Sequence, residues 1–198
     1  MTTMKKYSQS LLGSFCLLAL IPIAAQAQDH EGHDHKDGQA EKMMATPLIA
    51  KLQATEGNET SGTIMFKMAE DGKGVTITMK VKGLQPNSKH AIHVHEFGDL
   101  SAADGTSAGG HFNPEGHDHG LPEQEMRHVG DLGNLDADED GNAEKTMTVS
   151  NMSLTHGKNA VLGRGVVVHV AEDKGTQPTG DAGARIAVGV IGIQKSEK

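Results

Sequence analysis

The stretch AIHVHEF, residues 91–97, indicates both the fold and the chemistry of this chain. Ile92 and Val94 alternate with His93 and His95, which is the period of two expected of a β-strand. Side chains two residues apart lie on one face, about 7 Å apart along the strand. We therefore expect Ile92 and Val94 to face a core. We expect the two histidines to point outward together, close enough to share one metal ion.

Short alternating runs of the same kind fill most of the chain. They are PLIAKLQAT (47–55), GTIMFKMAE (62–70), VTITMKVKG (75–83), AEKTMTVS (143–150), VVVHV (166–170) and RIAVGVIGI (185–193). The turn EDGKG (70–74) is typical of a hairpin, and no segment shows a sustained helical period. This pattern predicts an all-β domain, built as an antiparallel sandwich or barrel.

The middle of the chain, residues 98–142, is rich in Gly, Asp, His and Pro and is expected to be a loop. A loop of this length inside a compact domain is unusual unless it is functional. It carries four further histidines: His111, His117, His119 and His128. Imidazole nitrogen is a common donor to copper and zinc, so the histidines together predict a metal site.

His169 interrupts the apolar run VVVHV, as His93 and His95 interrupt theirs. It is a further candidate metal ligand. The alternative is a core histidine whose nitrogens are satisfied by hydrogen bonds.

Residues 1–27 have the pattern of a signal peptide. Lys5 and Lys6 precede an apolar stretch at 11–25, and Ala-Gln-Ala at 25–27 fits a cleavage site. The alternative is a membrane anchor, but fifteen apolar positions are few for a span. We expect no membrane anchor and an exported protein, periplasmic or secreted, whose mature chain starts near Gln28.

Residues 28–45 are polar, acidic and rich in histidine, and we expect a disordered tail. His30, His33 and His35 could bind a metal loosely or simply be solvated. The folded domain is expected to span residues 46–195.

The single cysteine, Cys16, lies inside the expected signal peptide, so the mature chain would have no disulfide. Cleavage also removes Lys5 and Lys6, leaving 16 basic and 26 acidic residues and a net charge of −10. This acidic balance argues against nucleic acid as a partner.

Five blocks, in order, resemble the copper/zinc superoxide dismutases. They are HVHEFGD (93–99), SAGGHFNPEGHDHG (107–120), RHVGDLGN (127–134), GRGVVVHV (163–170) and GDAGARIAVGVIGI (180–193). The resemblance runs from about residue 46 to 194. It implies an eight-stranded Greek-key antiparallel β-barrel with long metal-binding loops. It also implies an oxidoreductase that disproportionates superoxide to dioxygen and hydrogen peroxide.

The resemblance also implies two metal ligand sets that share one histidine. The copper ligands would be His93, His95, His111 and His169. The zinc ligands would be His111, His119, His128 and Asp131. His117 competes with His119 for one zinc position, and the spacing from His111 favours His119. Four nitrogens suit Cu(II), while three nitrogens and one carboxylate close a tetrahedral zinc shell that would order the long loop.

Three more roles follow from the resemblance. Asp173 would link His93 to His119 and fix the tautomer of each ring. Arg185 would attract the superoxide anion beside copper, and His111 would return a proton to the departing peroxide. The pattern alone leaves plainer alternatives: a turn aspartate at Asp131, a solvated acid at Asp173 and a surface arginine at Arg185.

The chain departs from the family at its disulfide, because Gly105 and Val188 stand where the family has two cysteines. The loop at 99–110 would then be tethered only by packing and metal, which predicts a strong dependence of stability on zinc. The resemblance also implies a homodimer, to whose subunit contact this loop contributes.

Two rival functions use the same residues. One is a non-catalytic periplasmic copper carrier or buffer, which the histidine tail favours. Cu(I) transfer favours soft thiolates, however, and the mature chain has none. The other is a structural zinc protein with a vacant copper site, against which the intact HVH motif and His169 argue.

Overall fold

The computed structural model describes residues 46–195, so the expected signal peptide (1–27) and histidine-rich tail (28–45) lie outside the described residues. Within that range the chain forms eight β-strands and one short 3₁₀ turn, Thr106–Ala108. The strands are β1 (Leu48–Ala54), β2 (Ser61–Met68), β3 (Val75–Lys82), β4 (Lys89–His95), β5 (Asp131–Asp136), β6 (Ala143–Val149), β7 (Gly165–His169) and β8 (Arg185–Ile193).

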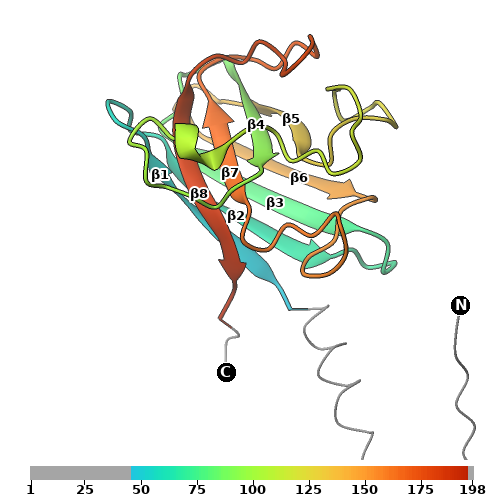
Figure 1. Ribbon diagram of the computed structural model, residues 1–198. Helices are drawn as coiled ribbons and strands as arrows, with labels where there is room; N and C mark the ends of the chain where they lie inside the picture. Colours follow the sequence, from blue (N-terminus) through green and yellow to red (C-terminus); the bar gives the residue numbers. More distant parts are fainter. Residues whose placement is uncertain (1–45, 196–198) are drawn as a thin grey trace, which may run out of the picture. The chain divides into compact units, whose positions relative to one another are not determined.

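The strands lie in the order β5-β4-β7-β8-β1-β2-β3-β6, and every neighbouring pair is antiparallel. The connections from β3 to β4 and from β6 to β7 cross between non-adjacent strands, which gives a Greek-key topology. Figure 1 shows the sheet curling into a nearly closed barrel. The prediction of an all-β, eight-stranded antiparallel Greek-key barrel is confirmed.

The barrel interior follows directly from the period of two. On β3, Val75, Ile77 and Met79 are buried, whereas Lys80 and Lys82 on the opposite face are exposed. Phe66 is the largest fully buried side chain, and the rest of the core is mainly aliphatic. Each such side chain contributes about 1.5–3 kcal/mol when fully buried. The packed interior therefore gives the site a rigid support.

The expectation of one continuous loop at 98–142 is wrong, because β5 lies inside it. Its sequence DLGNLD has only two apolar residues, Leu132 and Leu135, and contains a glycine, so it carries little strand signal. The strand forms because its backbone pairs with β4, with His90 opposite Leu135 and Ala91 opposite Asn134. Pairing with β4 therefore stabilises β5 although its own sequence has a low strand propensity.

The expectation that His93 and His95 point outward needs a correction. Both are buried, with 0% and 1% of their surface exposed. They lie on the face of β4 opposite the core side chains Ile92 and Val94, but loops cover that face. His93 contacts Asp173 at 2.9 Å, and the Nδ1 of His95 donates to the carbonyl of Gly109 at 2.9 Å. The histidine face of β4 is therefore a second, polar interior.

Candidate metal centre

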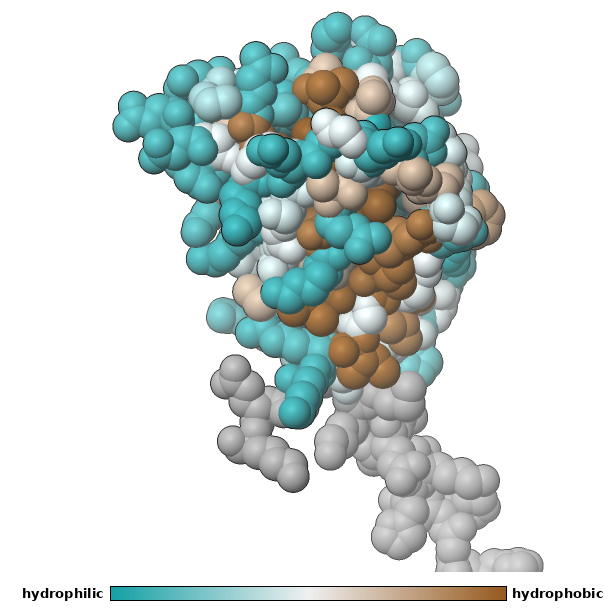
Figure 2. All heavy atoms as spheres, turned by 90° about the vertical axis from the view of Figure 1, so that its left-hand side faces the viewer, coloured by the Kyte–Doolittle hydropathy of each residue, from teal (hydrophilic) through white to brown (hydrophobic). Residues whose placement is uncertain are grey.

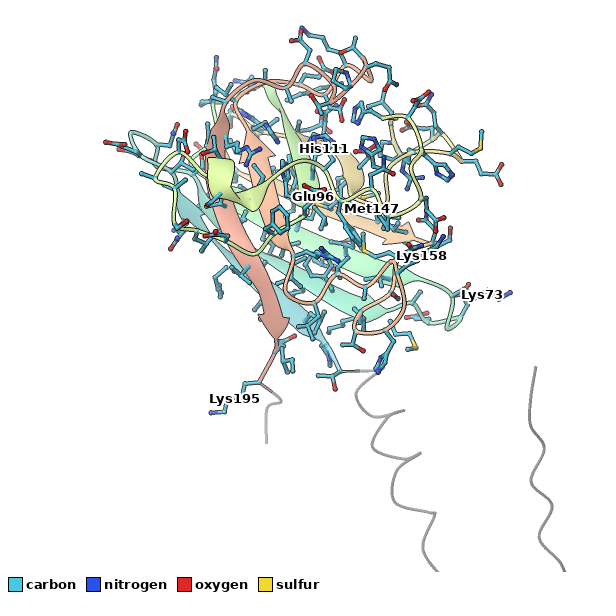
Figure 3. The ribbon with its side chains drawn as sticks, in the orientation of Figure 1. Lys73, Glu96, His111, Met147, Lys158 and Lys195 are labelled. Atoms are coloured by element: carbon cyan, nitrogen blue, oxygen red, sulfur yellow. The ribbon has the colours of Figure 1, made fainter. Side chains whose placement is uncertain are left out.

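Four histidines from three parts of the chain converge on the outer face of β4. His93 and His95 come from β4, and His169 ends the neighbouring strand β7. His111 lies in the loop that follows β4 and pairs with His95 in an isolated β-bridge. One ring nitrogen of each lies within 4.8 Å of the others. Figure 3 shows His111 beside β4, where several nitrogen-bearing side chains gather.

Hydrogen bonds fix the tautomers of three of these rings. The Nδ1 of His95 faces the carbonyl of Gly109, and the Nδ1 of His169 faces that of Gly183, at 2.9 and 3.0 Å. A carbonyl only accepts, so both Nδ1 atoms carry the proton and both Nε2 atoms are lone pairs. These two Nε2 atoms lie 3.4 Å apart and cannot bond to each other. The arrangement suits a cation between them.

His93 presents the third lone pair. Its Nε2 donates to Asp173 at 2.9 Å, and its buried Nδ1 has no hydrogen-bond partner within residues 46–195. A buried polar atom without a partner normally costs about 1–3 kcal/mol. A bound metal would remove this cost. Four imidazole nitrogens form a donor set that suits Cu(II).

A second group adjoins the first and shares His111. It consists of His111, His119, His128 and Asp131, all buried, with ligand atoms within 4.8 Å of one another. The Asp131 carboxylate lies 3.0 Å from the Nδ1 of His111, 3.0 Å from that of His119 and 3.2 Å from that of His128. Three nitrogens around one carboxylate are the donors of a closed tetrahedral zinc site.

The charge of Asp131 is well stabilised. The carboxylate is fully buried and accepts from the backbone amides of Gly120 and His128 at 3.0 and 3.1 Å. Although burial opposes ionisation, hydrogen bonds, chiefly with His111, His119 and His128, hold the pKa of Asp131 well below its usual range. The carboxylate is therefore an anion at neutral pH, as metal ligation requires.

His119 shows most clearly that this group fits a cation. Its buried Nδ1 lies 3.0 Å from a carboxylate oxygen of Asp131. Although burial disfavours the protonated ring, Asp131 and Asp173 outweigh it and raise the pKa of His119 to about 9. The metal-free group therefore binds a proton where a metal ion would otherwise sit.

The copper-type group has the opposite tendency. Burial lowers the pKa of His111 to about 4 and that of His169 to about 3. Burial also lowers the pKa of His95 well below its usual value. These three rings are therefore neutral at neutral pH and need not lose a proton before they bind a metal.

Asp173 connects the two groups. Its two carboxylate oxygens accept from the Nε2 of His93 and the Nε2 of His119, each at 2.9 Å. Each ring consequently directs Nδ1 into its own group. These contacts and the hydrogen bond from the Gly175 amide hold the pKa of Asp173 below its usual range against the effect of burial. Asp173 thus orients one ring of each group.

Arg185 lies at the mouth of the first group. Its guanidinium donates to the carbonyls of Gly105 and Gly109, at 2.6 Å in the second case. It lines a cavity of about 180 Å³ together with His95, His111 and His169. A cation held in this way, beside three of the four ring nitrogens, can attract and orient a small anion.

The loop at 99–110 is held by more than the packing and metal that we expected. Gly105 lies against Val188, and a Cβ on the glycine would approach a Val188 methyl to 2.7 Å. Val188 packs with Ala108, Val167 and Leu100 in a small apolar cluster. The Glu56 amide also donates to the Ala103 carbonyl at 2.9 Å, and Arg185 bonds the Gly105 carbonyl. Backbone hydrogen bonds therefore add to the packing.

The structure separates the two neighbouring loop histidines. His119 belongs to the second group, whereas the Nδ1 of His117 lies 3.2 Å from the Arg127 carbonyl and outside both groups.

The sequence reasoning missed His90. Its Nδ1 donates to the carbonyl of His169 at 2.9 Å from a fully buried position. In the sequence, only its place as a third histidine in KHAIHVH could have pointed to His90.

Comparison with known proteins gives consistent results. Residues 60–191 match the family model described as copper/zinc superoxide dismutase. The chain is 44% identical to a "Superoxide dismutase [Cu-Zn]" of Schizosaccharomyces pombe over 143 residues, which cover 69% of this chain and 92% of the relative. It is 46% identical to one of Botryotinia fuckeliana over 154 residues, covering 74% and 99%. It is also 42% identical to an "Extracellular superoxide dismutase [Cu-Zn]" of Drosophila melanogaster over 154 residues, covering 74% and 83%.

Among solved structures, the crystal structure of the clock protein EA4 matches with a TM-score of 0.68 and 40% identity. The match covers 76% of this chain and 96% of that one. With the family model matched over most of the barrel, these relatives show that the chain belongs to the copper/zinc superoxide dismutase family, whose cofactors are copper and zinc and whose reaction is the disproportionation of superoxide.

Proposed function

We propose that two adjoining ligand sets carry the superoxide dismutation that this enzyme catalyses. Copper would be held by His93, His95, His111 and His169, and zinc by His111, His119, His128 and Asp131. The observation that carries this assignment is the convergence of buried ligand atoms in two adjoining groups. His111 belongs to both groups and would serve both metals.

The matched pair of His117 and His119 tests the zinc assignment. His119→Leu is expected to lose zinc, because it removes one of only three nitrogen donors. His117→Leu keeps zinc, because its ring contacts a backbone carbonyl instead. Metal analysis of both purified variants measures this. Zinc loss in the His117 variant and retention in the His119 variant would reverse the assignment.

Copper bound by these residues would supply the one-electron redox chemistry between two superoxide ions. Two superoxide ions and two protons thus yield one dioxygen and one hydrogen peroxide. The protein supplies a proton at a fixed atom. The Nδ1 of His111 lies within the zinc set, which leaves Nε2 on the copper side. We assign Nε2 as the atom that delivers a proton to the departing peroxide.

Arg185 binds the substrate. Its guanidinium lines the cavity beside His95, His111 and His169, and two carbonyls fix its orientation. The substrate is an anion, and the net charge of the whole chain is −8. A fixed local cation offsets the unfavourable overall charge at this mouth.

Replacing Arg185 is expected to lower activity without emptying the metal sites. Arg185→Leu should reduce the second-order rate constant about 10- to 100-fold, because a charged hydrogen-bond donor to the substrate is lost. Arg185→Lys should keep part of the activity, since it retains the charge but loses the paired carbonyl contacts. Pulse radiolysis of the metal-loaded variants measures the rates. Full activity in the leucine variant would exclude this role.

The rival carrier function is not favoured, because the named relatives are dismutases. Nor is a zinc protein with a vacant copper site, because all four copper-type histidines converge.

We also propose that residues 1–27 direct export and are removed, placing the enzyme in the periplasm or outside the cell. One relative is named as extracellular, and within residues 46–195 there is no helix long and apolar enough to cross a membrane. N-terminal sequencing of the exported protein tests cleavage, with Gln28 expected first.

A homodimer is the assembly we propose. Figure 2 shows apolar atoms gathered on the face at the left of Figure 1, where β1 and β8 lie. Phe97 is 54% exposed, and Val190 is 36% exposed and lies against Gly98. Burying these side chains between two copies would stabilise the pair. Sedimentation is expected to give a dimer for the natural chain and a monomer for Phe97→Glu. A natural monomer would exclude the proposal.

A further inference from the structure

Lys145 occupies an inward-facing position on β6. The strand alternates, with Ala143 and Val149 buried on the same side and Glu144 exposed on the other. Met147, labelled in Figure 3, lies on the Lys145 side and packs against the core. Placing an ammonium among these apolar neighbours is costly unless its donors are satisfied. Burial accordingly lowers the pKa of Lys145, with partial compensation from Asp136 and Glu123.

The ammonium group of Lys145, on β6, donates hydrogen bonds to β5 across the gap between these two edge strands of the barrel. β5 and β6 are the two ends of the strand order, and no backbone ladder joins them within the described residues. The ammonium donates to the carbonyl of Leu132 at 3.0 Å and to that of Asn134 at 2.9 Å. Carbonyls two residues apart on a strand edge point the same way, so one cation serves both. Lys145 thus links β5 to β6, which are not joined by backbone hydrogen bonds of a β-ladder.

The strand that Lys145 contacts carries one proposed zinc ligand, Asp131, and the residue that anchors Asp173. Asp131 immediately precedes Leu132. The side chain of Asn134 donates to the carbonyl of Asp173 at 3.0 Å and accepts from its amide at 2.7 Å. Asp173 in turn holds His93 and His119. Lys145 therefore binds the carbonyl of the residue that follows Asp131. It also binds the carbonyl of Asn134, whose side chain holds Asp173.

We infer that Lys145 is a positioning residue for the zinc site: it clamps β5 to β6 and so fixes Asp131 and, through Asn134, Asp173. The inference rests on the zinc ligand set proposed above. An apolar side chain at this position would fill the space but leave two carbonyls without a donor. The strand edge would then be free to shift, and the zinc ligands with it.

Zinc release from the metal-loaded protein tests the clamp. Lys145→Met keeps the aliphatic chain but removes the donors, and Lys145→Arg keeps a charged donor. Lys80→Met is the matched control, because Lys80 makes only an exposed ion pair with Glu144 on the other face of the same sheet. With a chromophoric chelator, Lys145→Met should release zinc about 10- to 100-fold faster, as is typical when a partner outside the ligand shell is lost. Lys145→Arg should release zinc at close to the natural rate, and Lys80→Met should release it at the natural rate.

Three results would overturn the inference. They are zinc release from Lys145→Met at the natural rate, no recovery in Lys145→Arg, and equal acceleration of copper and zinc release, which would show a general loss of stability. If Lys145→Met does not fold, Lys145→Leu, which also lacks any donor, takes its place with the same expectations. Asp131→Ala separates the two proposals. If it retains zinc, the ligand set is wrong; if it loses zinc while Lys145→Met does not, only the clamp is wrong.

Discussion

Removing both metals is expected to lower the melting temperature by about 15 °C or more, since each kcal/mol of lost stability shifts a domain of this size by about 2–4 °C. The metal-free protein leaves the Nδ1 of His93 buried without a hydrogen-bond partner among the described residues. The loop at 99–110 also has no disulfide to tether it, because the described residues contain no cysteine. Family members that keep the disulfide retain one more constraint in the metal-free state.

Calorimetry of the natural chain before and after chelation measures this shift. Adding zinc alone back should recover most of the loss, because the zinc set joins the loop residues His111, His119 and His128 to β5. A shift of only a few degrees on chelation would contradict the expected dependence on metal. It would show that the apolar cluster around Val188 and the backbone hydrogen bonds of the loop are sufficient.

His169→Leu should reduce dismutation more than about 100-fold, beyond the usual effect of losing a residue outside the ligand shell. The substitution would remove one of the four proposed copper donors, and His169 lies outside the proposed zinc group. Zinc should therefore remain at one equivalent while copper is lost. Activity and metal content are measured on the same preparation. His156→Leu is the control, because His156 is exposed and outside both groups. Normal activity in the His169 variant would remove it from the copper site.

The sequence predicted most strands because the interior of the barrel imposes a period of two on them. β3 shows this most simply, with Val75, Ile77 and Met79 buried in alternation. β5 escaped prediction because its formation depends on pairing with β4 and not on local propensity. The burial of His93 and His95 escaped for a similar reason. Alternation shows which side of a strand a residue takes, but it does not show whether a distant loop covers that side.

The candidate site was predictable to a different degree. The spacing of histidines indicated a metal site, and the resemblance supplied the individual ligands. The supporting residues carried no pattern of their own. Lys145 is an ordinary strand lysine in the sequence, and its role depends on two β5 carbonyls brought near by barrel closure. His90 depends in the same way on the carbonyl of His169 on a neighbouring strand.

The most direct test of the account is the rate of superoxide dismutation by the purified mature protein, with copper and zinc determined on the same sample. We predict fast dismutation with one copper and one zinc per chain, which would show that the family disulfide is dispensable here. Full occupancy of both metals with no dismutation would contradict the account. It would mean that these ligands store or carry copper. The cause would then be sought in Arg185 and in the loop at 99–110, which has no disulfide.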